Sequence, residues 1–159
     1  MLSARLLDRI DRNWERIAAE VIAHGRRDAR LRKYHSLSDA EIRERARDLV
    51  SNLRLWLEGM TEEELVRRYQ SLGERRCRAG VPLHEMVLKI QLIKRKIASF
   101  ATEQNLSMTA LEVYEEMELL RVLGRYFEIV IHSAVEGYER ELRKRLDDAQ
   151  SSLPAAVGL

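Results

Sequence analysis

The segment from Thr109 to about Asp147 contains no proline and has the sequence pattern of one long helix. Apolar and small residues recur in it at spacings of four and three, which average to a 3.5-residue repeat and keep one seam aligned over many turns. The seam consists of Val113, Met117, Leu120, Gly124, Phe127, Ile131, Ala134 and Tyr138. Such a helix measures roughly 55–60 Å, more than a domain of this size needs to cover its own core.

The excess apolar length predicts that something lies along this helix. A second copy of the chain, or a downstream module reached by the stiff helix, is the natural candidate, and both favour an interaction or signalling role over an enzyme. We therefore expect a homodimer with an interface formed by Met117, Leu120, Gly124, Phe127, Ile131, Ala134 and Tyr138. We also expect a protein partner or an output domain beyond the helix.

The length of 159 residues suits one domain, which we expect over residues 1–147, followed by a loose tail over 148–159. Charges nearly balance, with 28 Lys and Arg against 26 Asp and Glu, so the net charge of +2 makes a nucleic-acid partner unlikely in spite of several short basic runs. The sequence shows no secretory signal and no apolar run of about 20 residues, so we expect a soluble cytoplasmic protein without a membrane partner.

Four shorter helices are predicted before the long one. An apolar stripe with charged residues opposite it predicts a helix over residues 3–23. Ser38 and Thr61 are each followed three residues later by Glu, which is a start signal for helices that end near Gly59 and Gly80.

A fourth helix is expected to begin at Pro82, where the missing N–H costs nothing. Its pattern predicts an apolar buried face, with Lys89, Lys94 and Lys96 pointing to water. The polar residues 102–107 separate it from the long helix. Without any strand-like alternation, the chain is predicted to be an all-α bundle of about five main helices in which the last two pair antiparallel.

The sequence carries no catalytic signature. It lacks a nucleophile elbow, a P-loop, a dinucleotide fingerprint and a Cys/His cluster for zinc, so no catalytic or metal-ligating residue is assigned. His84 is expected at the surface or at a pocket rim. His132 is expected to be a partly buried structural residue, with a phosphoacceptor role as the alternative, although the proline that follows such a histidine in sensor kinases is missing.

Two other features leave alternatives open. Gly124 and Gly137 lie inside the long helix and cost about 1 kcal/mol each relative to Ala, so either the helix tolerates them or another helix approaches closely. Haem is the cofactor to consider for a bundle of this kind, but the predicted helix over 62–78 contains no histidine. Tyr69 is the candidate iron ligand there, and its expected place is the core. Trp14 and Trp56 lie on apolar stripes and are also predicted core residues.

Three stretches of the chain resemble a known family. LSDAEIRERARDLVSNL, TEEELVRRY and RCRAGVPLHEMVLKIQLIKR are similar, in this order, to the N-terminal domain of RsbT co-antagonist proteins of the RsbR/RsbRD type, and the resemblance covers roughly Trp14 to Arg143. It implies a globin-like fold without haem, dimerisation through the final helices and a place in bacterial stress signalling. The best-known members of that family continue into a STAS domain.

The same comparison bears on haem. Haem-binding globin-coupled sensors carry a histidine four residues before a glycine that opens the next helix, whereas here Arg76 stands four residues before Gly80. The resemblance therefore implies no haem and no assigned cofactor, while another small ligand in the remaining pocket stays open.

The leading expectation is thus a non-enzymatic, homodimeric sensor or regulatory domain that relays a signal through its long C-terminal helix. The alternatives are a sensor that binds haem or another small ligand, and a phosphotransfer module that uses His132.

Overall fold

The computed structural model describes residues 2–102 and 109–153, and within them the chain forms six α-helices and one 3₁₀ turn. In chain order these are α1 (Leu2–Arg12), α2 (Trp14–Arg27), the turn Tyr34–Ser36, α3 (Asp39–Leu57), α4 (Glu62–Arg78), α5 (Leu83–Ala101) and α6 (Ala110–Ser151). The described residues contain no strand, which confirms the all-α class and is consistent with a globin-like bundle.

The first predicted helix is divided in two at Asn13. The Asn13 side chain donates a hydrogen bond to the backbone oxygen of Arg9 at 2.8 Å, and its backbone leaves the helical region with ψ near 8°. Asparagine competes in this way with backbone hydrogen bonding. The single helix over residues 3–23 is therefore wrong, and its second half extends to Arg27.

The predicted helix starts and stops agree with the structure. The hydroxyls of Ser38 and Thr61 accept hydrogen bonds from the backbone N–H three residues later, so both cap their helices. Gly59 and Gly80 follow the ends of α3 and α4 with positive φ angles of 120° and 73°, a conformation that a side chain disfavours. A full capping box at Thr109, which the sequence reading did not name, begins α6.

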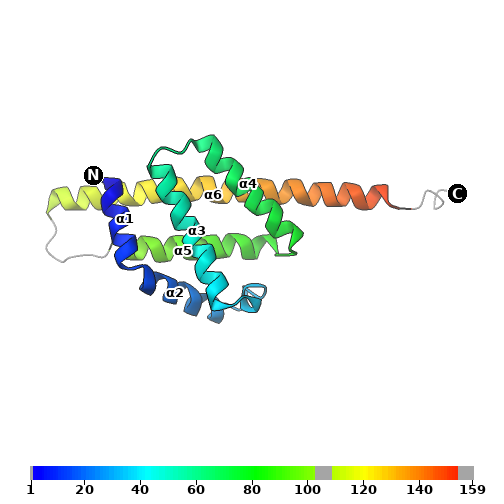
Figure 1. The fold of residues 1–159 in the computed structure, drawn as a ribbon, viewed down its shortest axis with the longest axis horizontal. Helices are drawn as coiled ribbons and strands as arrows, with labels where there is room; N and C mark the ends of the chain where they lie inside the picture. The colour runs from blue at the N-terminus through cyan, green and yellow to red at the C-terminus, as the bar shows by residue number, and fades with distance from the viewer. Residues whose placement is uncertain (1, 103–108, 154–159) are drawn as a thin grey trace.

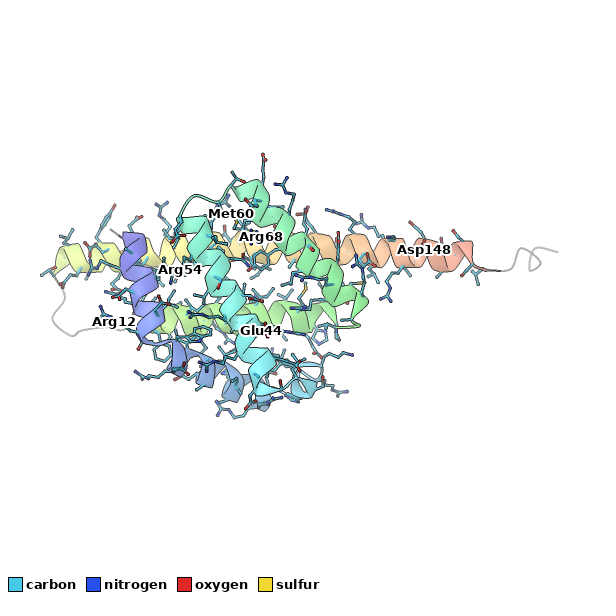
Figure 2. All side chains as sticks on the ribbon, viewed as in Figure 1. Arg12, Glu44, Arg54, Met60, Arg68 and Asp148 are labelled. Atoms are coloured by element: carbon cyan, nitrogen blue, oxygen red, sulfur yellow. The ribbon has the colours of Figure 1, made fainter. Side chains whose placement is uncertain are left out.

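Helices α5 and α6 form the expected antiparallel pair, and they run side by side through the centre of the molecule (Figure 1). Helices α1, α3 and α4 lie across this pair, while α2 lies along α5. The 42 residues of α6 span about 63 Å, and the C-terminal part extends beyond the other helices. Figure 2 shows the side chains around Asp148 projecting away from the body of the domain. Residues 103–107 of the predicted connection 102–107, and residues 154–159 of the predicted tail 148–159, lie outside the described residues.

The closest helix contact joins α4 to α6. A Cβ built on Gly73 of α4 would stand 1.9 Å from the backbone oxygen of Ala134, and a Cβ on Gly137 of α6 would stand 1.9 Å from the backbone oxygen of Gln70. The two backbones therefore touch directly, and only glycine fits at these two positions. Gly137 thus marks a close approach by another helix, whereas a Cβ on Gly124 would meet nothing within 4 Å.

The core also ties α3, α4 and α6 together through two tyrosines. Tyr126 of α6 is fully buried, and its hydroxyl donates to the backbone oxygen of Leu49 at 2.7 Å. The hydroxyl of Tyr69 lies 3.2 Å from that of Tyr126 and accepts a hydrogen bond from Asn52. Tyr69 is therefore a core residue as expected. Trp14 is likewise buried, and Trp56 packs against the same core from a partly buried position.

Candidate functional site

A cavity of about 220 Å³ lies between α3, α4, α5 and the 3₁₀ turn. One part of its wall is apolar and consists of Leu49, Leu72, Val81, Met86, Ile90 and Ile93. The cavity is larger than an engineered apolar cavity of about 150 Å³ that holds benzene, and smaller than most pockets for drug-sized ligands, which begin at about 300 Å³. Its size suits a small organic molecule.

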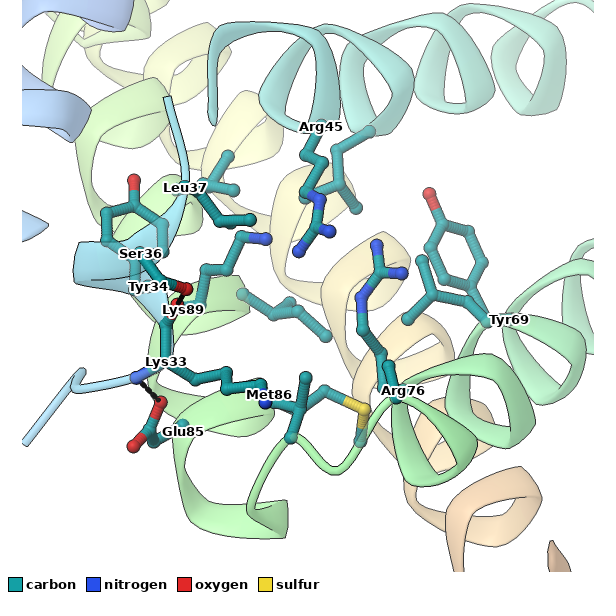
Figure 3. Close-up of a pocket in the computed structure, with 16 residues that line it drawn as sticks. Lys33, Tyr34, Ser36, Leu37, Arg45, Tyr69, Arg76, Glu85, Met86 and Lys89 are labelled. Atoms are coloured by element: carbon teal, nitrogen blue, oxygen red, sulfur yellow. Dashed lines mark hydrogen bonds between the residues drawn. The ribbon is translucent and has the colours of Figure 1, made fainter. Parts of the chain in front are cut away.

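Four cationic side chains line this cavity: Lys33 comes from the loop before the 3₁₀ turn, and the other three come from three different helices. Arg45 comes from α3, Arg76 from α4 and Lys89 from α5, and Figure 3 shows them pointing toward one another. Across residues 2–102 and 109–153, none of the three makes a hydrogen bond or ion pair; the Lys89 ammonium instead lies 5.5 Å from the centre of the Tyr34 ring. All three are partly buried, and converging cations without an acid in ion-pair contact are unusual at such positions, because charges removed from water are ordinarily paired.

The one acid among the lining residues is already engaged elsewhere. Glu85 is buried, and its two carboxylate oxygens accept hydrogen bonds from the backbone N–H groups of Arg32 and Lys33 at 3.1 and 2.9 Å. Figure 3 shows Glu85 on the far side of the cavity from Arg45 and Arg76. It therefore orders the loop before the 3₁₀ turn and does not neutralise the three cations.

The electrostatics of the cavity follow from this arrangement. Burial, reinforced by Arg45 and Arg76, lowers the pKa of the Lys89 ammonium well below its usual value. Burial also lowers the pKa of Arg76 to about 10, with further lowering by Arg45 and Arg75, and the nearby Asp48 opposes this shift only in part. Both shifts have the sign expected for partly buried cations that outnumber the acids near them, so an anion placed among them would be favoured.

The sequence contains a signal for this cluster that the prediction missed. Arg45 and Lys89 each lie three residues after one core residue and four before another, and Arg76 lies four residues after Leu72 and seven after Tyr69. All three cations thus continue the apolar stripe of their helix. The expectation that Lys89 points to water is wrong, because its position on the stripe directs it into the cavity.

The cavity lining also bears on haem. It contains no histidine among the described residues, and Arg76 occupies the position where the comparison with haem sensors places one. The hydroxyl of Tyr69 is held by Tyr126 and Asn52. The position that the comparison assigns to the iron-binding histidine is therefore filled by an arginine, whose guanidinium is not an iron ligand.

The predicted interface residues of α6 separate into two groups. Phe127 and Ala134 are 0% exposed and pack in the core of the chain itself, which makes them unavailable to a partner. This corrects their place in the expected seam: Leu120 lies only about 20° from Phe127 around the helix. The two differ because the rest of the chain covers α6 at Phe127 and Ala134 and leaves it exposed at Leu120. A charge at Phe127 would disrupt the fold rather than an interface.

The other predicted residues lie on a less covered face of α6, where Ile131 and Tyr138 still pack, partly buried, against the chain's own core. Met117 and Leu120 are 64% and 45% exposed, while Gly124, Ile131 and Tyr138 are partly covered. Tyr138 donates its hydroxyl to the backbone oxygen of Val81 at 2.7 Å. Other apolar side chains continue the same face of the helix toward both ends. We call this face the outer stripe, and it comprises Val113, Met117, Leu120, Gly124, Ile131, Val135, Tyr138, Leu142 and Leu146.

The two singled-out histidines lie outside the cavity. His132 projects into solvent from α6, with Nδ1 3.3 Å from a carboxylate oxygen of Glu136, so the expectation of a partly buried residue is wrong. His84 is exposed in the first turn of α5, as expected. Among the described residues, no group of three or more His, Cys, Asp or Glu side chains is placed to hold a metal ion.

No helix in residues 2–102 or 109–153 combines the length and apolar character needed to cross a membrane. A family model described as the RsbT co-antagonist protein rsbRD N-terminal domain matches residues 15–153 of the chain. No curated protein and no solved structure gives a significant match.

Proposed function

The chain belongs to the family of RsbT co-antagonist protein rsbRD N-terminal domains, which are regulatory domains of stress-response signalling, and on that premise we propose that it is a non-enzymatic cytoplasmic regulator that acts as a homodimer. The two copies pair along the outer stripe of α6. A signal changes the packing of α4 against α6, and α6 passes the change to a protein partner or output domain.

The observation that carries the dimer is the exposure of large apolar side chains along α6. Three of them lie on the outer stripe in the N-terminal part of α6, namely Val113, Met117 and Leu120, and two more, Leu142 and Leu146, lie on it in the C-terminal part of the helix. The residues of the outer stripe are three, four or, between Gly124 and Ile131, seven positions apart, so they stay on one side of α6, and two α6 helices related by a twofold axis present matching surfaces to each other.

The direct contact between α4 and α6 supports the relay. Helix α4 lines the cavity with Leu72 and Arg76, and the neighbouring Gly73 touches the α6 backbone at Ala134. Packed backbones have no flexible side chains between them to absorb a displacement, so a shift of α4 must either move α6 or break the contact. The cavity and the outer stripe are therefore connected through a single helix.

A cysteine scan tests the pairing. Met117→Cys, Leu120→Cys and Leu142→Cys are oxidised separately, and we expect a covalent dimer from at least one of them, because equivalent residues near a twofold axis meet each other. The native Cys77 is buried and serves as an internal background. Leu111→Cys is the matched control, since Leu111 is 67% exposed but lies off the outer stripe. If none of the three stripe variants cross-links, or if the control cross-links equally well, α6 does not form the interface.

A further inference from the structure

The cavity between α3, α4 and α5 has a cationic side and an apolar side, and each limits what it can hold. The cationic side presents Arg45, Arg76 and Lys89 without an acid to neutralise them. The apolar side offers six aliphatic or thioether side chains and no hydrogen-bonding groups from them. A purely apolar ligand would leave the cations unpaired, and a small inorganic anion would leave the apolar wall uncovered.

We propose that this cavity binds a small amphipathic carboxylate, with its carboxylate among Arg45, Arg76 and Lys89 and its apolar body against Leu49, Met86 and Ile90. Arginine side chains match a carboxylate with two parallel hydrogen bonds, and an ammonium adds a point charge. The cavity volume of about 220 Å³ admits an apolar body of about six to eight carbon atoms, by comparison with the cavity of about 150 Å³ that holds benzene.

The surface next to the cavity offers a path for an anion. A polar groove between α3 and α4 adjoins it and shares Arg45, Tyr69 and Arg76 with its lining. Arg68 and Arg75 also line this groove, where the one acidic side chain among its described residues is Asp48. The excess of positive charge attracts anions toward the cavity.

The position of the site gives the ligand a structural consequence. A carboxylate held by three helices draws Arg45, Arg76 and Lys89 toward one point, and it removes the repulsion that the three cations otherwise exert on one another. Binding therefore favours a closer packing of α3, α4 and α5. This inference goes beyond the proposed function, because binding requires neither a dimer nor a signalling partner.

Isothermal titration calorimetry of the intact protein with sodium octanoate tests the proposal. We expect saturable binding of one octanoate per chain, with little binding of 1-octanol, which has the same apolar body without the charge. Arg76→Gln and Lys89→Met should each weaken octanoate binding by at least about tenfold, as expected for the loss of one charge-assisted hydrogen bond. Arg67→Gln is the matched control, because Arg67 is exposed on α4 and lines neither the cavity nor the groove.

Each other result has a definite meaning. Equal affinity for 1-octanol and octanoate would overturn the cationic half of the site, and equal affinity for inorganic phosphate would overturn the apolar half. Absence of saturable octanoate binding, or equal weakening by Arg67→Gln, would overturn the proposal as a whole. Circular dichroism melts confirm that the variants are folded, and Lys89→Met should melt no lower than the wild type because it removes an unpaired charge. A monomeric protein that binds octanoate would refute the proposed dimer and leave this inference intact.

Discussion

Substitution of Gly137 by Ala tests the close contact on which the α4–α6 relay depends. The added Cβ would stand 1.9 Å from the backbone oxygen of Gln70 and 2.6 Å from its backbone carbon. Overpacking of a well-filled interior costs about 1–3 kcal/mol, and a clash with backbone belongs at the upper end because no side chain can turn away. Replacing glycine by alanine within a helix offsets about 1 kcal/mol. We therefore expect a net loss of about 2 kcal/mol in the free energy of unfolding.

Thermal and urea denaturation monitored by circular dichroism measure this effect. For a chain of this length, a loss of about 2 kcal/mol lowers the melting temperature by about 4–8 °C. Gly73→Ala should behave in the same way, since its Cβ would stand 1.9 Å from the backbone oxygen of Ala134. Gly124→Ala is the matched control on α6, because its Cβ meets nothing within 4 Å in the chain, and it should gain up to about 1 kcal/mol. If Gly137→Ala is as stable as the wild type, the two backbones do not touch and the relay has no structural basis.

Three further predictions concern charge and burial. Because the pKa of Lys89 in the folded state lies below 10.5, Lys89 lowers the free energy of unfolding increasingly as the pH falls from 10.5 to that pKa. Lys89→Met should therefore raise the free energy of unfolding at pH 7 by roughly 1–3 kcal/mol. Urea titrations at several pH values should show that the variant has lost this pH dependence of stability. Burial raises the pKa of Tyr34 from 10.0 to about 12, so the free energy of unfolding falls as the pH rises from 10 to 12, and it should fall less for Tyr34→Phe. An ultraviolet titration of Tyr34→Phe should lack the one phenol of the wild type that ionises near pH 12, and a titration identical to that of the wild type would contradict the assignment. Arg9 pairs with the poorly exposed Glu116, so Arg9→Met should lower the free energy of unfolding, measured by chemical denaturation, by about 1–3 kcal/mol. Arg5→Met breaks the more exposed pair with Glu115 and should lower it by less than about 1 kcal/mol. Equal losses in the two variants would refute the role of burial.

Local signals in the sequence predicted most of the helices. Capping residues such as Ser38 and Thr61 act within one turn, so their effect on the backbone is readable without the fold. The division at Asn13 was missed because the apolar stripe continues through it, and a stripe records which face is buried but not whether the backbone is continuous.

The candidate site was harder to predict for a different reason. Arg45, Arg76 and Lys89 lie on three helices far apart in the sequence, and only the packing of those helices brings them together. Each of them occupies a position on the apolar stripe of its helix, which is a detectable signal, but a long cationic side chain at such a position often reaches water with its charged end. The long-range arrangement decides between these outcomes.

The faces of α6 show the same limitation. The spacing of apolar residues predicted a seam but not which part of it the chain would bury itself. Phe127 and Ala134 lie on the side that meets the chain's own core, whereas Met117 and Leu120 lie about a quarter-turn or less away and remain exposed. A repeat in one helix cannot distinguish a contact within the chain from a contact with a second copy.

Sedimentation velocity of the intact protein is the most direct test of the claim that α6 pairs with a second copy through its outer stripe. We expect a species with twice the chain mass of 18.6 kDa, and Met117→Glu should convert it to the single-chain mass while the melting curve stays cooperative. Leu111→Glu, which places a charge at an equally exposed residue off the stripe, should leave the larger species intact. A wild-type protein that sediments at the single-chain mass at high concentration, or equal dissociation by both variants, would contradict the account.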